Sequence, residues 1–128
     1  MIRGMKALSV RQPWAWLILD AGKDIENRNW QPANPALRFR GSCLIHASLT
    51  RDPTQQELCD RVKRISGLDL PPEDSLPQGG IVGQVDVTEV VYTSASPWFT
   101  GPCGLVLTNP RRLDFRPCRG RLGFFDPF

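Results

Sequence analysis

Apolar and polar positions alternate along most of the chain, and in two stretches the apolar positions recur instead at every third or fourth residue. The alternating stretches predict strands at 6–10, 23–30, 42–47, 81–92 and 103–108, with weaker candidates at 113–117 and 122–125. The other two stretches predict helices at 13–21 and 53–66. Because strands and helices do not alternate, we expect an α+β fold: a small, mostly antiparallel β-barrel of five or six strands with two flanking α-helices.

Local signals refine where these elements begin, end and bend. The first helix has one apolar stripe, formed by Trp14, Leu17, Ile18 and Ala21, and should dock on the core through it. Asp52-Pro53 followed by Gln55 predicts a capping box at the start of the second helix. Gly83 predicts a bulge or a close approach of another segment to the backbone within the strand 81–92, and Asn109-Pro110 predicts the end of the strand 103–108.

Length and composition favour one globular domain over residues 1–128, since two domains would each be unusually small. The longest strongly apolar run, Trp14–Leu19, is far shorter than the roughly 20 residues that a membrane-spanning helix needs. No basic segment followed by an apolar one precedes this run. We therefore expect a soluble, cytoplasmic protein that does not contact a membrane.

Histidine and cysteine usage argues against a metal site. The chain has one histidine, His46, and four cysteines, at 43, 59, 103 and 118, with no Cys-x-x-Cys pair. A zinc tetrahedron needs four such ligands at closer spacing, so we expect no metal and no cofactor. The cysteines are expected to be small buried apolar residues rather than disulfide partners.

The net charge of +3 is unevenly distributed along the chain. Residues 1–40 carry 7 basic and 3 acidic groups, residues 41–100 carry 4 and 8, and residues 101–128 carry 5 and 2. If the two ends meet in the fold, they form a basic face suited to nucleic acid. Scattered solubilising charge is the other interpretation of the same pattern.

The strand at 23–30 is unusually polar. Alternation places Glu26, Arg28 and Trp30 on one side and Lys23 on the other. One interpretation is an exposed edge strand protected by its charges. The other is a polar cleft in which Glu26 and Arg28 hold each other in place, while the guanidinium and the Trp30 indole stack on a base.

Several motifs, in order along essentially the whole chain, resemble the activating signal cointegrator homology (ASCH) domain. They are Leu8-Ser9, Gln12-Pro13-Trp14-Ala15, Lys23-x-x-Glu26-x-Arg28-x-Trp30, the segments 40–48, 80–86 and 108–110, and Gly120-Arg121-Leu122-Gly123-Phe124-Phe125. The Gln-Pro-Trp-Ala block joined to Lys-x-x-Glu-x-Arg at this spacing makes the resemblance specific.

The resemblance implies a PUA-like β-barrel, closed or nearly closed, with a basic cleft. Barrels of this kind often bind RNA, and ASCH domains are thought to hold a nucleotide or a modified base in the cleft. Carried onto this chain, the cleft residues are Lys23, Glu26 and Arg28, bordered by Gln12 and Trp14. The partner expected from the resemblance is RNA, a single strand or a modified nucleotide.

An enzymatic alternative also comes from the resemblance. One branch of the family hydrolyses N4-acetylcytidine with a lysine matching Lys23, a threonine and a glutamate. Here the threonine position holds Glu26, which argues against that amidohydrolase activity, and no residue clearly matches the glutamate. Metal-independent RNA cleavage is a further alternative, with Glu26 or His46 as the base and Lys23 or Arg28 as the cation.

The remaining candidates have two interpretations each. His46 is either a hydrogen-bonded structural residue or part of the cleft. The arginines at 111, 112, 116, 119 and 121 form either a solvated rim or a phosphate track. The expected ligand contacts are Gln12, Trp14, Arg28, Trp30, His46 and Arg121, with Lys23 and Glu26 as the residues of any catalysis. A protein-interaction module using the acidic middle segment is a third class.

Overall fold

The computed structural model describes residues 4–128. Its main elements are β1 (Ala7–Val10), α1 (Trp14–Asp20), β2 (Ile25–Arg28), β3 (Gly41–Ala47), α2 (Gln56–Ser66), β4 (Gly80–Val91), β5 (Cys103–Pro117) and β6 (Phe124–Phe125). Two single 3₁₀ turns lie at Pro35–Arg38 and Glu73–Ser75. Among these described residues, no helix has the length and apolar character to cross a membrane.

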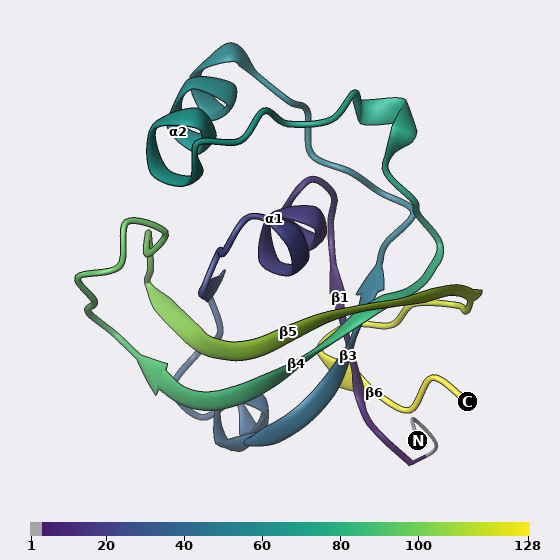
Figure 1. The fold of residues 1–128 in the computed structure, drawn as a ribbon. Coiled ribbons are helices and arrows are strands. Elements are labelled where there is room, and N and C mark those ends of the chain that lie inside the picture. Colours follow the sequence, from purple (N-terminus) through teal and green to yellow (C-terminus); the bar gives the residue numbers. More distant parts are fainter. Residues whose placement is uncertain (1–3) are drawn as a thin grey trace.

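All six strands form one sheet in the order β2-β5-β4-β3-β1-β6. Every neighbouring pair is antiparallel except β1 and β3. The long strands β4 and β5 bend around the molecule, so the sheet curls into a half-barrel (Figure 1). The predicted α+β class, with six mostly antiparallel strands and two helices, is confirmed.

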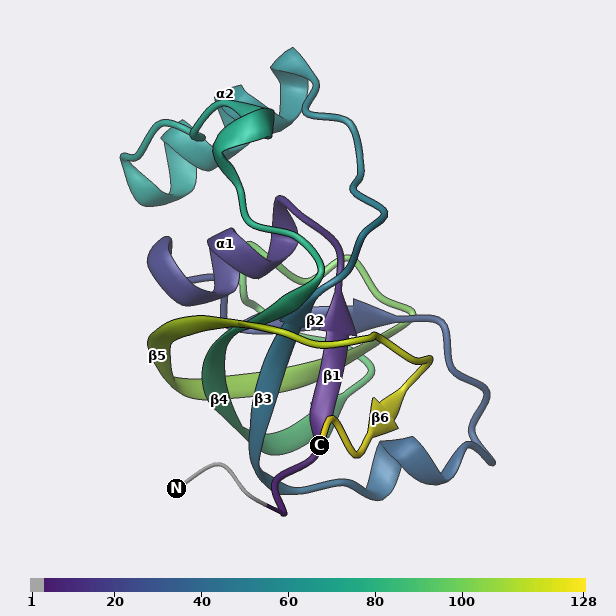
Figure 2. The same cartoon turned by 90° about the vertical axis from the view of Figure 1, so that its right-hand side faces the viewer.

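Side chains bridge the open side of the curl, where β2 at one edge of the sheet approaches β1 near the other (Figure 2). The Arg28 guanidinium on β2 donates to the Ser9 carbonyl oxygen on β1 at 2.7 Å. Just beyond β2, the Trp30 ring lies 6.0 Å, centroid to centroid, from Phe124 of β6. The barrel is therefore completed by an ionic hydrogen bond and an aromatic contact.

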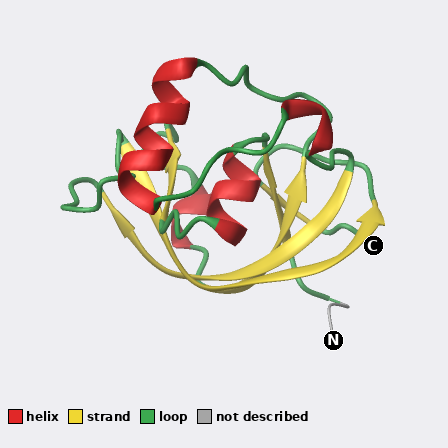
Figure 3. Cartoon of the chain, turned by 45° about the horizontal axis from the view of Figure 1, so that its top comes forward, coloured by secondary structure: helices red, strands yellow, loops and turns green. Residues whose placement is uncertain are grey.

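Helix α1 lies inside the curl, and α2 covers it from outside (Figures 1 and 3). Ile18 and Leu19 belong to the main core between α1 and the sheet. Leu17 faces the other way, into a second cluster with Val62 of α2 and Trp98. The prediction of a single buried stripe on α1 is wrong, because the helix is covered on two sides.

The predicted capping box at Asp52 is also wrong. Helix α2 begins at Gln56, three residues later than Pro53, and no side chain caps its first turn. The Asp52 carboxylate instead accepts hydrogen bonds from the Trp14 indole at 2.7 Å and from Arg11 at 3.0 Å. These tertiary partners, a partly buried indole N–H and a charged guanidinium, replace the local cap that the sequence suggests.

Strand β5 does not end at Asn109-Pro110 but runs on to Pro117, so the weak candidate at 113–117 is its second half. The register pairs Thr108 with Asp86 and Arg111 with Gln84, which leaves Asn109 and Pro110 opposite one residue, Val85. Asn109 has a φ of 51°. In this bulge the missing N–H of proline needs no partner, so the strand continues past it.

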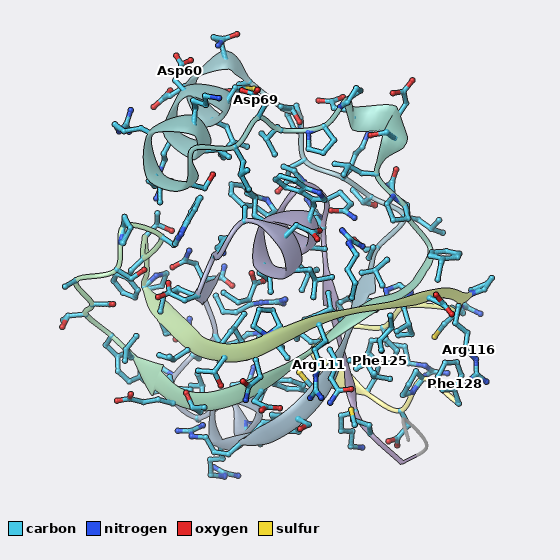
Figure 4. The ribbon with its side chains drawn as sticks, in the orientation of Figure 1. Asp60, Asp69, Arg111, Arg116, Phe125 and Phe128 are labelled. Atoms are coloured by element: carbon cyan, nitrogen blue, oxygen red, sulfur yellow. The ribbon has the colours of Figure 1, made fainter. Side chains whose placement is uncertain are left out.

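The two ends of the chain meet, as the charge argument required. Strand β1 pairs with β6, and the Lys6 ammonium lies 2.9 Å from Asp126. The last residue is anchored to β5, with the Phe128 ring 3.4 Å from the Arg116 guanidinium carbon (Figure 4). Of the four cysteines, all free thiols, those at 43 and 103 are buried, whereas those at 59 and 118 are partly exposed, contrary to expectation.

The bulge predicted at Gly83 is confirmed by a register shift between Ile81 and Gly83 against β5. A methyl group at this position would overlap the Leu19 side chain of α1 and lie 2.7 Å from the Arg111 carbonyl oxygen. The glycine therefore allows α1 to approach the sheet closely.

We expect Gly83→Ala to destabilise the fold by about 1–3 kcal/mol, because the core must move to make room for the methyl group. Urea unfolding followed by circular dichroism measures the change. Glu89→Ala, at an exposed position of the same strand, is the control and should stay within about 0.5 kcal/mol of the wild type. Equal stability of the two variants would contradict the close approach.

Candidate functional site

A cavity of about 520 Å³, here called the first cavity, opens beside the start of α1. It is lined by Ser9, Arg11, Trp14, Lys23, Glu26, Asn27, Arg28, Asn29, Asp52, Arg61, Trp98, Thr100 and Gly101. These residues come from β1, α1, β2, α2 and the connections between them. The volume lies in the range of sites that hold a small molecule or one group of a larger ligand.

Three charged side chains that the sequence singled out converge in the first cavity. Glu26 Oε1 lies 3.6 Å from Lys23 Nζ, and Glu26 Oε2 lies 2.9 Å from a terminal nitrogen of Arg28. The Glu26 side chain is 10% exposed and that of Lys23 is 4% exposed. The Glu26 carboxylate therefore lies between two cationic side chains in a place that is largely removed from water.

Alternation along 23–30 misplaced Lys23 on the face away from Glu26. Strand β2 begins only at Ile25, so the period-two rule does not apply to Lys23. Gly22 has a φ of 76°, and the Lys23 N–H donates to Leu17 O of α1 at 3.1 Å. This turn out of the helix points the Lys23 side chain back to the cluster, where Nζ donates to the Ile25 carbonyl oxygen.

Burial lowers the pKa of Lys23 below its ordinary value of 10.5, because the ammonium loses hydration. The neighbouring Glu26 carboxylate opposes this shift, and Arg28 adds to it. The result is an amine whose neutral form is more accessible than that of a surface lysine. Amines of this kind can act as proton acceptors or nucleophiles.

One wall of the first cavity is the Trp14 indole. Its N–H donates to Asp52, which fixes the ring, and Lys23 Nζ lies 5.7 Å from the ring centroid. Trp98, which also lines the cavity, is buried, with the Arg61 guanidinium 5.8 Å from its ring centroid. Two aromatic rings of the lining thus each have a cation nearby.

Asn27 holds the loop that forms the rim. Its side-chain nitrogen donates to Trp98 O at 3.0 Å, and its side-chain oxygen accepts from the N–H groups of Thr100 and Gly101 at 2.8 and 3.1 Å. One amide therefore satisfies three backbone groups between β4 and β5. It acts on the cavity by positioning this loop.

Of the six predicted ligand contacts, Trp14 and Arg28 line the first cavity, whereas Gln12, Trp30, His46 and Arg121 do not. Gln12 is 1% exposed; its amide accepts from Trp16 N and donates to Pro77 O, both at 3.0 Å. Trp30 lies at the side-chain closure, with the Arg28 guanidinium carbon 5.1 Å from its ring centroid. Both residues have structural contacts that account for their positions.

Two of the predicted contacts outside the first cavity, His46 and Arg121, both line a second cavity of about 530 Å³. His46 is buried, with Nε2 2.6 Å from Cys118 O and Nδ1 3.3 Å from the Ser9 hydroxyl. Because a carbonyl oxygen only accepts, the His46 Nε2–H group is the donor of this hydrogen bond to Cys118 O. The ring thereby fixes the segment after β5, and it is not among the residues that line the first cavity.

The five C-terminal arginines do not form one track. Arg112 pairs with Asp20 of α1, and Arg116 stacks on Phe128. Arg119 and Arg121 line the second cavity together with Arg11 from the N-terminal part of the chain. The N-terminal and C-terminal parts of the fold thus together supply the three arginines of the second cavity.

Sequence reasoning missed Asn27, Asp52, Arg61 and the rim loop. The sequence pattern predicts that Asp52 caps a helix, whereas in the fold its carboxylate accepts a hydrogen bond from the Trp14 indole. Arg61 gave no signal, because an exposed arginine on a helix is the commonest kind of surface residue. Asn27 lies within the polar strand pattern, but only the fold shows the loop that it holds.

In a comparison with known protein families, one family model matches the part of the chain that forms the first cavity. The model of the family described as the ASCH domain matches residues 8–105. Every residue lining the first cavity lies inside this range, whereas Arg119 and Arg121 lie beyond it. No curated protein matches the chain. In the described part of the chain, no three His, Cys, Asp or Glu side chains are grouped to hold a metal ion.

We expect Lys23 to react with an acylating reagent with a pH midpoint below 10.5, because only the neutral amine reacts and burial favours it. Peptide mapping across a pH series measures this, with the exposed Lys6 and Lys63 as internal references. In Glu26→Gln the midpoint should fall further, since the carboxylate that favours the charged amine is gone. A Lys23 midpoint at or above 10.5 in the wild type would contradict the buried cluster.

Proposed function

The chain belongs to the ASCH domain family, and on that premise we propose that it binds single-stranded nucleic acid, preferably RNA, by holding one base, ordinary or modified, in the first cavity. The observation that carries the proposal is the buried Lys23–Glu26–Arg28 cluster at the base of an open cavity of about 520 Å³. The PUA-like fold of this family is often linked to RNA binding.

The polar groups of the first cavity suit the edge of a base. Glu26 is an acceptor, and Lys23 and Arg28 are donors, so the cluster can pair with the mixed donors and acceptors of a base edge. The Trp14 indole supplies a flat face for stacking. A bare phosphate is a poorer fit, because Glu26 and Asp52 would repel it.

A single strand is favoured over a duplex because the charged groups are recessed. Glu26 and Lys23 are each less than a tenth exposed by residue, so only a base unstacked from its neighbours can reach them. Recognition of RNA commonly uses unstacked bases in loops and single strands, held on aromatic and arginine planes. The cavity has both kinds of plane, in Trp14 and Arg61.

The test is fluorescence anisotropy with labelled hexameric RNAs of each base, the corresponding DNAs, and an RNA duplex. Glu26→Gln should bind the single strands about 10-fold more weakly, because an acceptor at the base edge is lost. Glu89→Gln removes the same charge outside both cavities and is the matched control. Simple electrostatics predicts that both variants bind as well as or slightly better than the wild type, so the two explanations differ in sign.

Unchanged affinity in Glu26→Gln, or duplex binding as tight as single-strand binding, would overturn the proposal. Thermal unfolding of each variant checks that it folds. If Glu26→Gln fails to fold, Trp14→Leu gives an independent answer, with an expected loss of about 5- to 150-fold from the missing stacking face.

A second candidate, a small metal-independent hydrolase acting on RNA or on a modified nucleoside, rests on the lowered pKa of Lys23. The neutral amine can accept a proton from a 2′-hydroxyl or attack an acyl carbon, and Glu26 lies 3.6 Å away to exchange that proton. Arg28 supplies positive charge for a developing anion. All three groups line the same cavity that binding would use.

This hydrolase proposal predicts turnover of N4-acetylcytidine or of a hexameric RNA that persists in EDTA. Turnover should fall at least 100-fold in Lys23→Met, whereas Lys63→Met, an exposed lysine on α2, should retain wild-type activity. Activity lost on chelation, or retained in Lys23→Met, would assign the reaction elsewhere. Chromatographic separation of products measures both.

A further inference from the structure

The second cavity adjoins the first and differs from it in charge. Ser9 and Arg11 line both. Ser9 connects them directly, since its carbonyl oxygen accepts from Arg28 at 2.7 Å and its hydroxyl lies 3.3 Å from His46 Nδ1. A ligand in the first cavity that extends past Ser9 therefore reaches the second.

The lining of the second cavity is cationic without a carboxylate. It includes Arg11, Arg119 and Arg121 and no Asp or Glu, whereas the first cavity includes Glu26 and Asp52. Arg11 is already paired with Asp52. The guanidinium groups of Arg119 and Arg121 form no hydrogen bond or ion pair with any residue in 4–128. Two arginines whose guanidinium groups have no partner among residues 4–128 suit a phosphate.

The segment carrying these arginines packs against Ser9 and His46, which line the second cavity. A Cβ on Gly120 would lie 2.6 Å from His46 Cε1 and 3.0 Å from the Ser9 hydroxyl. His46 Nε2 holds the preceding carbonyl, Cys118 O, at 2.6 Å. Gly120 thus allows the backbone to lie directly on Ser9 and His46, with Arg119 and Arg121 on either side of the contact.

We propose that the second cavity is the phosphate subsite of the bound nucleic acid, with Arg119 and Arg121 binding a phosphate next to the nucleotide whose base occupies the first cavity. This proposal rests on the proposed function. In this proposal the first cavity, which contains carboxylates, binds the base. The second cavity, which has arginines and no carboxylate, binds the phosphate. The phosphate belongs either to that nucleotide or to its neighbour in the strand.

The experiment measures the salt dependence of binding for a labelled uridine hexamer. The double variant Arg119→Gln, Arg121→Gln loses the one phosphate that the two arginines bind, so the slope of log K against log salt should become shallower by about 0.7, the value for one phosphate of a single strand. The matched control, Arg64→Gln with Arg111→Gln, removes the same charge from exposed arginines outside both cavities and should change the slope by less than about 0.3.

Competition with uridine and its 5′- and 3′-monophosphates identifies the source of the phosphate. A monophosphate that competes better than uridine, with its advantage lost in the Arg119/Arg121 variant, assigns the phosphate to the bound nucleotide. If neither monophosphate gains over uridine while the hexamer slope still falls, the phosphate belongs to the neighbouring nucleotide. Both results support the subsite.

A wild-type slope in the Arg119/Arg121 variant would overturn the subsite. If Glu26→Gln still weakens the hexamer in the same assay, only the subsite fails, and the proposed function stands. If the wild-type protein binds no hexamer at all, both fail. The substituted arginines are exposed, so thermal unfolding should match the wild type and rule out misfolding as the cause.

Discussion

The ionic contact of Arg28 with Glu26 and with the Ser9 carbonyl oxygen is the constraint on which the structure depends. The six strands curl without closing through backbone pairing, and Arg28 reaches across the opening from β2 to β1. The same side chain neutralises Glu26, whose other oxygen faces Lys23. Because an unpaired charge in so buried a place costs several kcal/mol, closure of the sheet and assembly of the charged cluster are one event.

The closure and the first cavity thus share the same short strand. Glu26 is held between Lys23 and Arg28, and the rim loop is held by Asn27. Strand β2 has only four residues, yet it supplies the cluster, the closure and the rim support. Strand β2 does lie at an edge of the sheet, but Glu26 and Arg28 line the first cavity, so these charges do not serve to protect that edge.

The fold class and the residues of the cluster were predictable, because alternation, helical spacing and the ASCH motifs are all local signals. Lys23, Glu26 and Arg28 lie together as the resemblance implied. The errors arose where a distant partner overrides a local rule. Asp52 does not cap a helix, because its carboxylate accepts a hydrogen bond from Trp14, 38 residues away. Strand β5 continues through Asn109-Pro110 because its pairing with β4 accommodates a bulge there. Gln12 lies in the matched motif, but its amide is used by Trp16 and Pro77.

The most direct test of base binding in the first cavity is the nuclear magnetic resonance spectrum of the tryptophan indole N–H groups. The chain has four tryptophans; Trp14 lines the first cavity, and Trp16 lines none of the cavities described above. On titration with a single-stranded RNA hexamer, the account predicts that the Trp14 indole signal shifts while the Trp16 signal stays in place. A Trp14 signal that does not move when the hexamer binds would contradict it.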